Sequence, residues 1–587
     1  MQAALKRAAG VLLPVSSLWD EYGIGTFGEE AYHFVEQLSR AGQKYWQVLP
    51  IGPTSYGDSP YQSYSAFAGN QYFIDPETLV KEGLLYREEI EAHKWGDTAS
   101  YVSYDRIYSG RTHLLRVAYD RALGRPIPLE RIYNGIYDDE EQRRSQEEGY
   151  VAPAIRFPDR YQDLGNYCAD SNGADSLQEN VGAATYAGAT DHTSAIPENC
   201  YKLSREYLDF CENSSQWLDD FVLYCALKDH FHGKSWMDWD EDIKRRTPEA
   251  LERYRKLLAD DMDFYRFVQF EFYREWHHLK QYANDRGIEI IGDIPLYMAL
   301  DSADVWADPR LFLLSEDLVP TVVAGCPPDA FSADGQLWGN PIYDWEAHKA
   351  EDFAWWRRRM KANASLYDVI RVDHFIGIVR YYKIPWGDTD GRRGEFAFGP
   401  GEELTRAMDE AVGGKKIIAE DLGIMIPEVK ALLAKTGYPG MRVLQFAFDG
   451  NPENDHLPYE YDRNSVAYCD THDNETLMGY AKTHPEDYRR LCEYFHIKDM
   501  YAEAAECGAV LATENIITQV IRWMYASCAS VVILSAQDLL GLGNEARINL
   551  PSSTGDNWKW RLAPGEMNDE VFLRMKVRKL AEVYGRV

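Results

Sequence analysis

Three segments, DVIRVDHF (368–375), KIIAEDLG (416–423) and SVAYCDTHDNE (465–475), each place a carboxylate at or just beyond the end of an apolar run. These carboxylates follow one another at intervals of roughly 50 residues, a spacing that suits repeated strand-helix units. Such units deliver their acids to the same end of a barrel, where the acids can act together. The three carboxylates are Asp373, Glu420 and Asp473.

Eight short apolar runs are predicted to be the strands of one parallel sheet. Buried parallel strands are continuously apolar rather than alternating, and these runs fit that pattern. Most of them end in Asp, Glu, Gln or Ser, at the end where a barrel places its active site. We therefore predict an α/β fold, a (β/α)8 TIM barrel. The runs lie near residues 10, 45, 288, 369, 416, 441, 465 and 530.

Helical patterns separate many of these runs. The segment TFGEEAYHFVEQLSRAG (26–42) offers a capping box from Thr26 to Glu29, an apolar stripe and a terminating glycine. PEVKALLAKTG (427–437) likewise has an apolar face and a terminating glycine, and DEVFLRMKVRKLAEVYG (569–585) is predicted to be the last barrel helix.

Two connections are too long for a plain crossover and are predicted to be insertions into a single catalytic barrel that spans 1–587. After the second strand, residues 54–286 should form a mostly helical subdomain. It includes a segment, 134–200, that is rich in Gly, Asp and Asn and is expected to be a surface loop. After the third strand, residues 296–365 should form a lid.

Composition excludes several classes of partner. The chain has 62 Lys and Arg against 94 Asp and Glu, a formal net charge of −32, and no basic block, so a nucleic acid is not an expected partner. Neutral substrates are not repelled by this charge. The 40 Tyr and 16 Trp offer flat apolar faces that can stack on sugar rings, although core packing would also account for any one of them.

The nine cysteines form no CxxC pair, so neither a disulfide framework nor a zinc site is indicated. They are interpreted as buried thiols in a reducing compartment, which predicts a cytoplasmic protein. No uninterrupted run of about 18 apolar residues occurs, so no membrane-spanning helix is expected.

Paired carboxylates of this kind suit the cleavage of an α-glucosidic bond with retention, which requires a nucleophile and an acid about 5 to 5.5 Å apart. Arg371 lies two residues before Asp373 and so faces the same side of the strand. A guanidinium there would keep Asp373 ionised and aimed. The alternative is a buried ion pair that only ties the strand to its neighbour.

Glu420 and Asp421 adjoin, so only one of them is expected to enter the barrel mouth. We predict Glu420 as the general acid and base, because the nearby charge of Asp373 should raise its pKa, and Asp421 as a loop or cap residue. His472 and Asp473 are predicted to bond sugar hydroxyls. A metal site is not expected, since consecutive residues do not converge easily on one ion.

Several long segments resemble the 4-α-glucanotransferases known as amylomaltases, or disproportionating enzymes, of the α-amylase superfamily. GDSPYQS and GQLWGNP are the most specific matches, and the resemblance covers nearly the whole chain outside 134–200. The matching segments are LPIGPTSYGDSPYQSYSAFAGNQYFID (49–75), WLDDFVLYCALKD (217–229), IIGDIPLYMALDSADVWADP (290–309), GCPPDAFSADGQLWGNPIYDW (325–345) and GLGNEARINLPSSTGDNWKWR (541–561), together with the three carboxylate segments.

The resemblance implies a barrel without a separate C-terminal β-domain and a role for each acid. By position, Asp373 resembles the nucleophile, Glu420 the acid/base and Asp473 the transition-state stabiliser. Asp293 resembles a supporting donor-subsite residue, and Arg371, like His472, resembles a direct substrate contact.

Further substrate-binding residues are implied in the same way. Tyr61 resembles a stacking residue near the cleavage point, and Tyr56 one at a more distant glucan groove. Trp338 lies in a Gly-rich segment (325–340) that resembles a loop over the bound glucan. The remaining expected contacts are Asn340, His374 and Asn474.

The implied reaction moves a segment of an α-1,4-glucan to the 4-hydroxyl of another glucan or of glucose, through a covalent glucosyl-Asp intermediate. Expected partners are maltodextrins and fragments of starch or glycogen. No cofactor is expected, and the oligomeric state is left open. The triad alone does not exclude a hydrolase of α-1,4-glucans or a catalytically inactive glucan-binding module.

Overall fold

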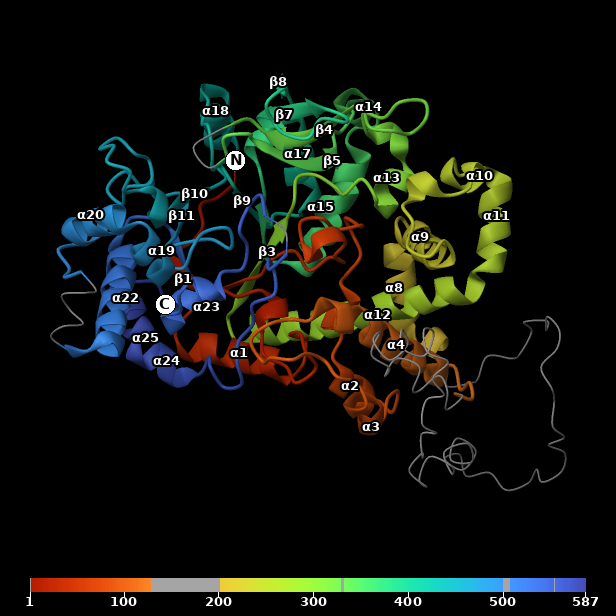
Figure 1. The fold of residues 1–587 in the computed structure, drawn as a ribbon, viewed down its shortest axis with the longest axis horizontal. Helices are drawn as coiled ribbons and strands as arrows, with labels where there is room; N and C mark the ends of the chain where they lie inside the picture. Colours follow the sequence, from red (N-terminus) through yellow and green to blue (C-terminus); the bar gives the residue numbers. More distant parts are fainter. Residues whose placement is uncertain (1, 128–200, 329–331, 500–506, 554) are drawn as a thin grey trace, which may run out of the picture. The chain divides into compact units, whose positions relative to one another are not determined.

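The computed structural model describes residues 2–127, 201–328, 332–499, 507–553 and 555–587 (Figure 1). They belong to two units. The larger comprises Met1–Asp75, Gly96–Tyr104 and Trp217–Val587, and the smaller comprises Pro76–Trp95 and Asp105–Gln216. The predicted loop at 134–200 lies outside the described residues.

Eight parallel strands form the central sheet of the larger unit, in the order β10-β11-β12-β1-β2-β3-β6-β9. Every predicted strand is present, and nearly all of their residues are buried, which explains why each run is continuously apolar. The strands are β1 (Ala8–Leu12), β2 (Tyr45–Gln47), β3 (Glu289–Ile294), β6 (Val369–Val372), β9 (Lys416–Ala419), β10 (Gly440–Val443), β11 (Ser465–Tyr468) and β12 (Val531–Ser535).

The two outer strands of this order, β9 and β10, approach each other and close the sheet into a barrel. Ala419 N–H donates to the carbonyl of Pro439 at 3.0 Å, and Met441 N–H donates to Oδ1 of Asp421 at 2.6 Å. Gly440 permits this approach, because a Cβ there would lie 2.3 Å from Oδ2 of Asp421. The predicted (β/α)8 barrel is thus confirmed.

Helices precede most of the strands, as the sequence predicts. The helix α1 buries the predicted stripe, but its N-cap is Gly28 and it has no side-chain cap. The predicted capping box is therefore wrong: the Thr26 hydroxyl donates to Asp20 at 2.5 Å instead. The barrel helices are α1 (Glu29–Arg40), α12 (Ala259–Asp285), α15 (Ala354–Leu366), α17 (Glu402–Ala411), α18 (Pro427–Thr436) and α22 (Ala509–Ala526).

The predicted last helix is two helices, because Lys576 has a φ of +55° and interrupts it. They are α24 (Asp569–Arg574) and α25 (Val577–Val583). Further helices of the larger unit lie in its connections: α9 (Leu218–His230), α10 (Glu241–Lys244), α11 (Pro248–Leu257), α13 (Ala303–Ala307), α14 (Trp345–Ala350), α16 (Ile376–Val379), α19 (Leu477–Thr483), α20 (Pro485–Phe495) and α23 (Ala536–Leu540).

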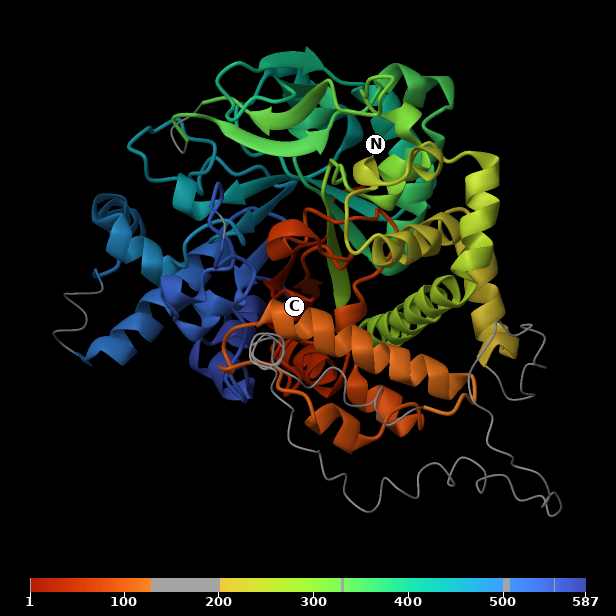
Figure 2. The ribbon, with the colours of Figure 1, turned by 45° about the vertical axis from the view of Figure 1, so that its right-hand side comes forward.

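A second, antiparallel sheet was not foreseen from the sequence. Its order is β5-β4-β7-β8, and Figure 2 shows its strands in green and teal at the top of the view. Two strands come from the connection after β3 and two from the connection after β6, so both ends of the segment predicted as a loop over the glucan (325–340) lie in antiparallel strands. The strands are β4 (Val322–Cys326), β5 (Gln336–Pro341), β7 (Arg380–Pro385) and β8 (Glu395–Phe398).

The smaller unit is helical in its described part. Within it, Glu89 is almost fully buried and accepts a hydrogen bond from Arg121 at 2.6 Å. Arg121 also lies over the ring of Tyr86, 4.5 Å from its centroid. The helices are α2 (Pro76–Lys81), α3 (Arg87–Glu91), α4 (Tyr104–Ala122), which belongs to this unit from Asp105 onward, and α8 (Arg205–Ser214).

The cysteines are only partly as predicted. Cys225, Cys469 and Cys492 are buried, but Cys528 is exposed. Three others (211, 326 and 507) are of intermediate exposure, whereas positions 168 and 200 lie outside the described residues. In the part of the chain that the structure describes, no helix is long and apolar enough to span a membrane.

Candidate active site

Asp373 and Glu420 follow two neighbouring strands, β6 and β9. Val372 pairs with Ala419 in this register, so the two acids occupy the next positions along adjacent strands. Glu420 N–H donates to the carbonyl of Val372 at 3.0 Å, which extends the pairing to the acid itself. The paired carboxyls predicted from the sequence therefore emerge side by side at the carboxyl end of the barrel.

Arg371 joins Asp373 to the preceding strand. Its Nη1 donates to Oδ2 of Asp293 at 2.5 Å and to Oδ1 of Asp373 at 3.0 Å, and its Nε lies 3.4 Å from Sδ of Met441. Arg371 and Asp293 are directly paired between β3 and β6 and are almost fully buried. Arg371 therefore ties the two strands together and also contacts the carboxylate of Asp373, so the ion pair does not only join the strands.

Two backbone amides hold the carboxyl group of Glu420. Oε2 accepts from His374 N–H at 2.7 Å, and Oε1 accepts from Leu422 N–H at 2.6 Å. His374 has a φ of +51°, a left-handed conformation that is rare for residues other than glycine and is concentrated at functional sites. Asp421 turns the other way and bonds β10, so Glu420 is the acid that enters the site.

Burial raises the pKa of Glu420 to about 8, and the charge of Asp373 acts in the same direction. Burial also raises the pKa of Asp373, to about 7, against the opposing effect of Arg371. Arg371 lowers this pKa, as expected of a neighbouring guanidinium, but burial and the charges of Asp293 and Asp473 outweigh it. Asp373 keeps 28% of its side-chain surface exposed, so water favours its ionised form, whereas Glu420 is the more buried of the two acids.

Asp473 lies on the loop that follows β11, and hydrogen bonds from nearby residues fix the conformation of this loop. Asn549 Nδ2 donates to Oδ1 of Asp473 at 2.6 Å, and Arg547 donates to the backbone carbonyl of Asp473 at 2.6 Å. Asn474 accepts from the backbone N–H and hydroxyl of Thr471 at 3.0 and 2.8 Å, which makes a tight turn. The contacts of Asn474 thus fix the loop, and its binding of substrate stays a prediction.

Tyr61 and His472 form a ring stack beside the carboxylates. Their centroids lie 5.0 Å apart with the planes 16° from parallel. The Tyr61 hydroxyl donates to Oδ2 of Asp293 at 2.8 Å, and Nε2 of His472 lies 3.4 Å from Oδ2 of Asp473. Burial lowers the pKa of His472, so its imidazole is neutral near pH 7 and can both donate to and accept from a hydroxyl.

Trp338 and Asn340 come from β5 of the second sheet. The Trp338 ring meets His374 edge to face, with centroids 4.9 Å apart. Asn340 Nδ2 donates to the carbonyl of Met298 at 2.9 Å, and Gln62 donates to Oδ1 of Asn340 at 3.2 Å. Burial lowers the pKa of His374 to about 4, so this ring too is neutral. The antiparallel sheet therefore contributes directly to the site.

Sequence reasoning missed Asn549, Arg547, Gln62 and Trp558. Arg547 and Asn549 lie in the segment 541–561, which resembles the family. They lie in a loop, and a loop has no periodic pattern that would show which side chains face the site. The side chain of Tyr56 is outside the described part, so its predicted groove contact is a prediction still. Among the described residues, no cluster of three or more His, Cys, Asp or Glu is arranged to hold a metal ion.

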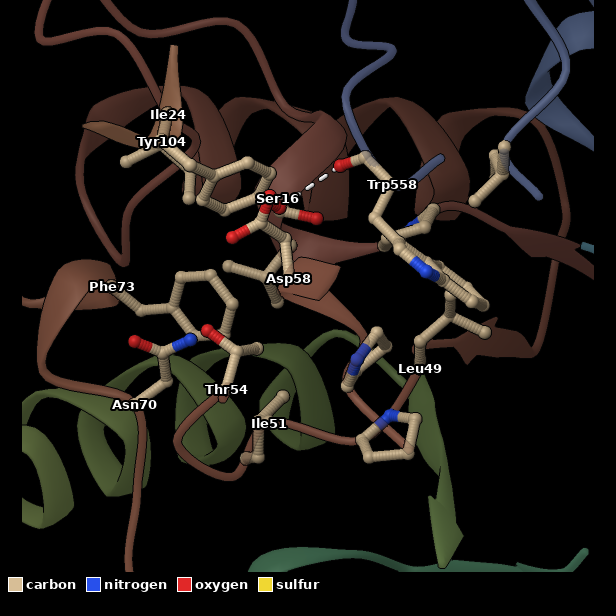
Figure 3. Close-up of a pocket in the computed structure, with 15 residues that line it drawn as sticks. Ser16, Ile24, Leu49, Ile51, Thr54, Asp58, Asn70, Phe73, Tyr104 and Trp558 are labelled. Carbon is tan, nitrogen blue, oxygen red and sulfur yellow. Dashed lines mark hydrogen bonds between the residues drawn. The ribbon is translucent and has the colours of Figure 1, made fainter. Parts of the chain in front are cut away.

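Trp558, which contacts Tyr61 and His472, is also part of the lining of a pocket (Figure 3). It encloses about 430 Å³, its open mouth included. Asp58 and Asn70 give it polar groups, while Phe73 and Tyr104 give it aromatic walls. None of the three carboxylates lines it, so it lies beside the reacting groups rather than around them.

Comparison with known proteins gives a consistent result. The family model described as 4-alpha-glucanotransferase matches residues 13–141 and 183–567, and the gap between these ranges falls within the segment 134–200. The 4-alpha-glucanotransferase of Clostridium butyricum is 39% identical over 575 residues, covering 97% of this chain and 99% of that protein. That of Thermus thermophilus is 35% identical over 587 residues, covering 99% and 100%.

A solved structure is similar over the same length. The amylomaltase from Streptococcus agalactiae, determined in complex with acarbose, superposes with a TM-score of 0.80 at 33% identity. The match covers 99% of this chain and 100% of that one.

Proposed function

This chain belongs to the 4-alpha-glucanotransferase family, and we propose that it moves a segment of an α-1,4-glucan from a donor chain to the 4-hydroxyl of an acceptor glucan or of glucose. The family resemblance predicted from the sequence is thereby confirmed. The donors and acceptors we infer are maltodextrins and fragments of starch or glycogen, which are neutral and suit a chain with a net charge of −32. We place the protein in the cytoplasm, in keeping with its free thiols.

Asp373 is assigned the nucleophile in this proposal. Its carboxylate, oriented by Arg371, attacks the anomeric carbon as the glycosidic bond breaks, and a glucosyl ester forms. Glu420 gives its proton to the departing oxygen, so the leaving glucan departs neutral with a free 4-hydroxyl. The observation that supports this assignment is the contact of Arg371 with Asp373 at 3.0 Å, which favours the ionised form of Asp373.

The second half reverses the roles. The 4-hydroxyl of the acceptor loses its proton to Glu420, its oxygen attacks the anomeric carbon, and the ester bond to Asp373 breaks. Two displacements at the same carbon retain the α configuration. Asp473, held by Asn549, is assigned the stabilisation of the oxocarbenium-like transition state through the ring hydroxyls.

The remaining predicted residues are assigned to substrate binding. Tyr61 and His472 present flat faces and neutral polar groups to a sugar ring, and Trp338 with Asn340 does the same from the second sheet. Transfer requires that the glucosyl ester react with an acceptor sugar before it reacts with water. A site that excludes water favours this outcome. We propose that the chain is a single catalytic barrel, that 54–286 is a subdomain inserted after the second strand, and that 296–365, inserted after the third, is the lid that serves this purpose.

Incubation of the pure protein with maltotriose tests the function. Transfer predicts glucose together with a ladder of longer maltodextrins, and no net rise in reducing ends. Glucose and maltose with rising reducing ends would instead indicate a hydrolase with the same triad. The variant Asp373→Asn should lose at least about 10³-fold of turnover, whereas a glucan-binding module without catalysis would be unaffected by it.

A further inference from the structure

Trp558 has a backbone conformation that bulky side chains rarely adopt. Its φ is +65°, where the Cβ of an L-residue is crowded by its own backbone. Two hydrogen bonds hold the residue there: its N–H donates to the carbonyl of Ile548 at 2.7 Å, and its carbonyl accepts from the Tyr104 hydroxyl at 2.9 Å. Such conformations persist where the surroundings fix them, and they are concentrated at functional sites.

The indole of Trp558 lines the pocket and also contacts residues of the active site. Figure 3 shows the Tyr104 hydroxyl joined to the Trp558 carbonyl across the top of the pocket, with the indole extending beside Leu49. Only 8% of Trp558 is exposed, and the residue is part of the pocket lining. Its two backbone hydrogen bonds help to fix the position of the ring.

The indole contacts both members of the Tyr61–His472 stack, neither of which lines the pocket. Its centroid is 5.7 Å from that of Tyr61 and 5.9 Å from that of His472, with planes inclined by 44° and 39°. Tyr61 bonds Asp293 through its hydroxyl, and Asp293 shares Arg371 with Asp373. A displacement of the indole would thus reach Asp373 through Tyr61.

We propose that Trp558 is a positioning residue that keeps the Tyr61–His472 ring pair in register with the carboxylate network. The left-handed backbone aims the indole at the two rings, and Tyr104 secures that backbone from the pocket side. Trp558 acts through Tyr61 and does not itself touch the reacting atoms. This inference rests on the proposed function, since it takes Asp373 as the nucleophile.

A double-mutant cycle tests the role of Trp558. Trp558→Asn removes the indole but tolerates the left-handed backbone, and Tyr61→Phe removes only the hydroxyl that reaches Asp293. In the maltotriose transfer assay, Trp558→Asn should lower kcat about tenfold or more with little change in KM, but only about twofold in the Tyr61→Phe background. Trp558→Phe should retain most of kcat, because a ring remains. Equal losses in both backgrounds overturn the proposal.

Tyr104→Phe provides the same test with every ring left in place. It removes the hydroxyl that anchors the Trp558 carbonyl, so its effect on kcat should likewise shrink when Tyr61→Phe is present. If Tyr104→Phe and Tyr61→Phe change kcat independently of each other, the proposed coupling is contradicted. This test stands even if circular dichroism shows that Trp558→Asn does not fold. Wild-type protein that only hydrolyses maltotriose contradicts the proposed function, whereas transfer with independent effects contradicts only the role of Trp558.

Discussion

Nη1 of Arg371 donates hydrogen bonds to two carboxylates, those of Asp293 at 2.5 Å and Asp373 at 3.0 Å. Asp293 belongs to β3 and Asp373 follows β6, so the group that joins the strands also orients the proposed nucleophile. The two acids then compete for one positive charge, because Asp293 raises the pKa of Asp373 while Arg371 lowers it. The ionisation of Asp373 therefore depends on how this charge is divided.

Substitutions at Asp293 and Arg371 should move the acidic limb of the pH profile in opposite directions. In Asp293→Asn the competing charge is lost, so the pKa of Asp373 falls and activity persists to lower pH. In Arg371→Lys the shorter, less well-directed cation stabilises the Asp373 carboxylate less, so its pKa and the limb both rise. Each shift should be roughly 0.5 to 1 pH unit in kcat/KM. Shifts in the same direction would contradict this division of charge.

Glu420→Gln should change the pH dependence of stability as well as abolish most turnover. The pKa of Glu420 is about 8 in the folded protein, above its ordinary value of 4.5. Between these values the folded state holds a proton that the unfolded state has lost, so wild-type stability falls as pH rises through this window, by at most about 1.4 kcal/mol per unit. The amide cannot ionise and lacks this slope.

The measurement is the melting temperature of both proteins from pH 5 to pH 8. At pH 5 the variant should be the less stable, because both oxygens of Glu420 accept backbone N–H bonds and an amide nitrogen cannot replace one of them. The difference should close as pH rises. A constant difference would show that Glu420 titrates in the folded protein as it does in the unfolded chain.

Features that depend on a local sequence pattern were predicted, whereas features that depend on contacts between distant segments were missed. The eight barrel strands are buried on both faces, so each can be recognised in the sequence as a continuous apolar run. The second sheet cannot, because its strands mix buried with partly or fully exposed residues and pair across two separate connections. Asp373 and Glu420 were predictable from strand ends. Asn549 and Trp558 were not, because they reach the site from a loop without periodicity.

The closure of the barrel at Asp421 should be measurable as a coupling with Gly440. Asp421→Ala removes the acceptor of the Met441 N–H and the partner of Arg442, which lies 3.4 Å from it, and should destabilise the protein by about 2 to 4 kcal/mol. Gly440→Ala should destabilise it too, because the added Cβ would lie 2.3 Å from the Asp421 carboxylate.

The double variant distinguishes this contact from two unrelated losses. With Asp421 already shortened to Ala, the carboxylate that Gly440→Ala would strike is gone, so the second substitution should add little to the first in urea unfolding. Fully additive effects would place the role of Gly440 elsewhere.

Asn549→Ala should lower kcat while leaving the fold intact. Asn549 donates to Oδ1 of Asp473 at 2.6 Å, and without it the Asp473 carboxylate, whose side chain is 46% exposed, is free to turn toward water. A misdirected carboxylate stabilises the transition state less, so kcat should fall roughly 10- to 100-fold with a smaller change in KM. The matched control is Asn544→Ala on the same loop, because Asn544 donates to Glu475 and not to Asp473. Equal losses in the two variants would mean that the loop as a whole, rather than the bond from Asn549, holds Asp473 in place.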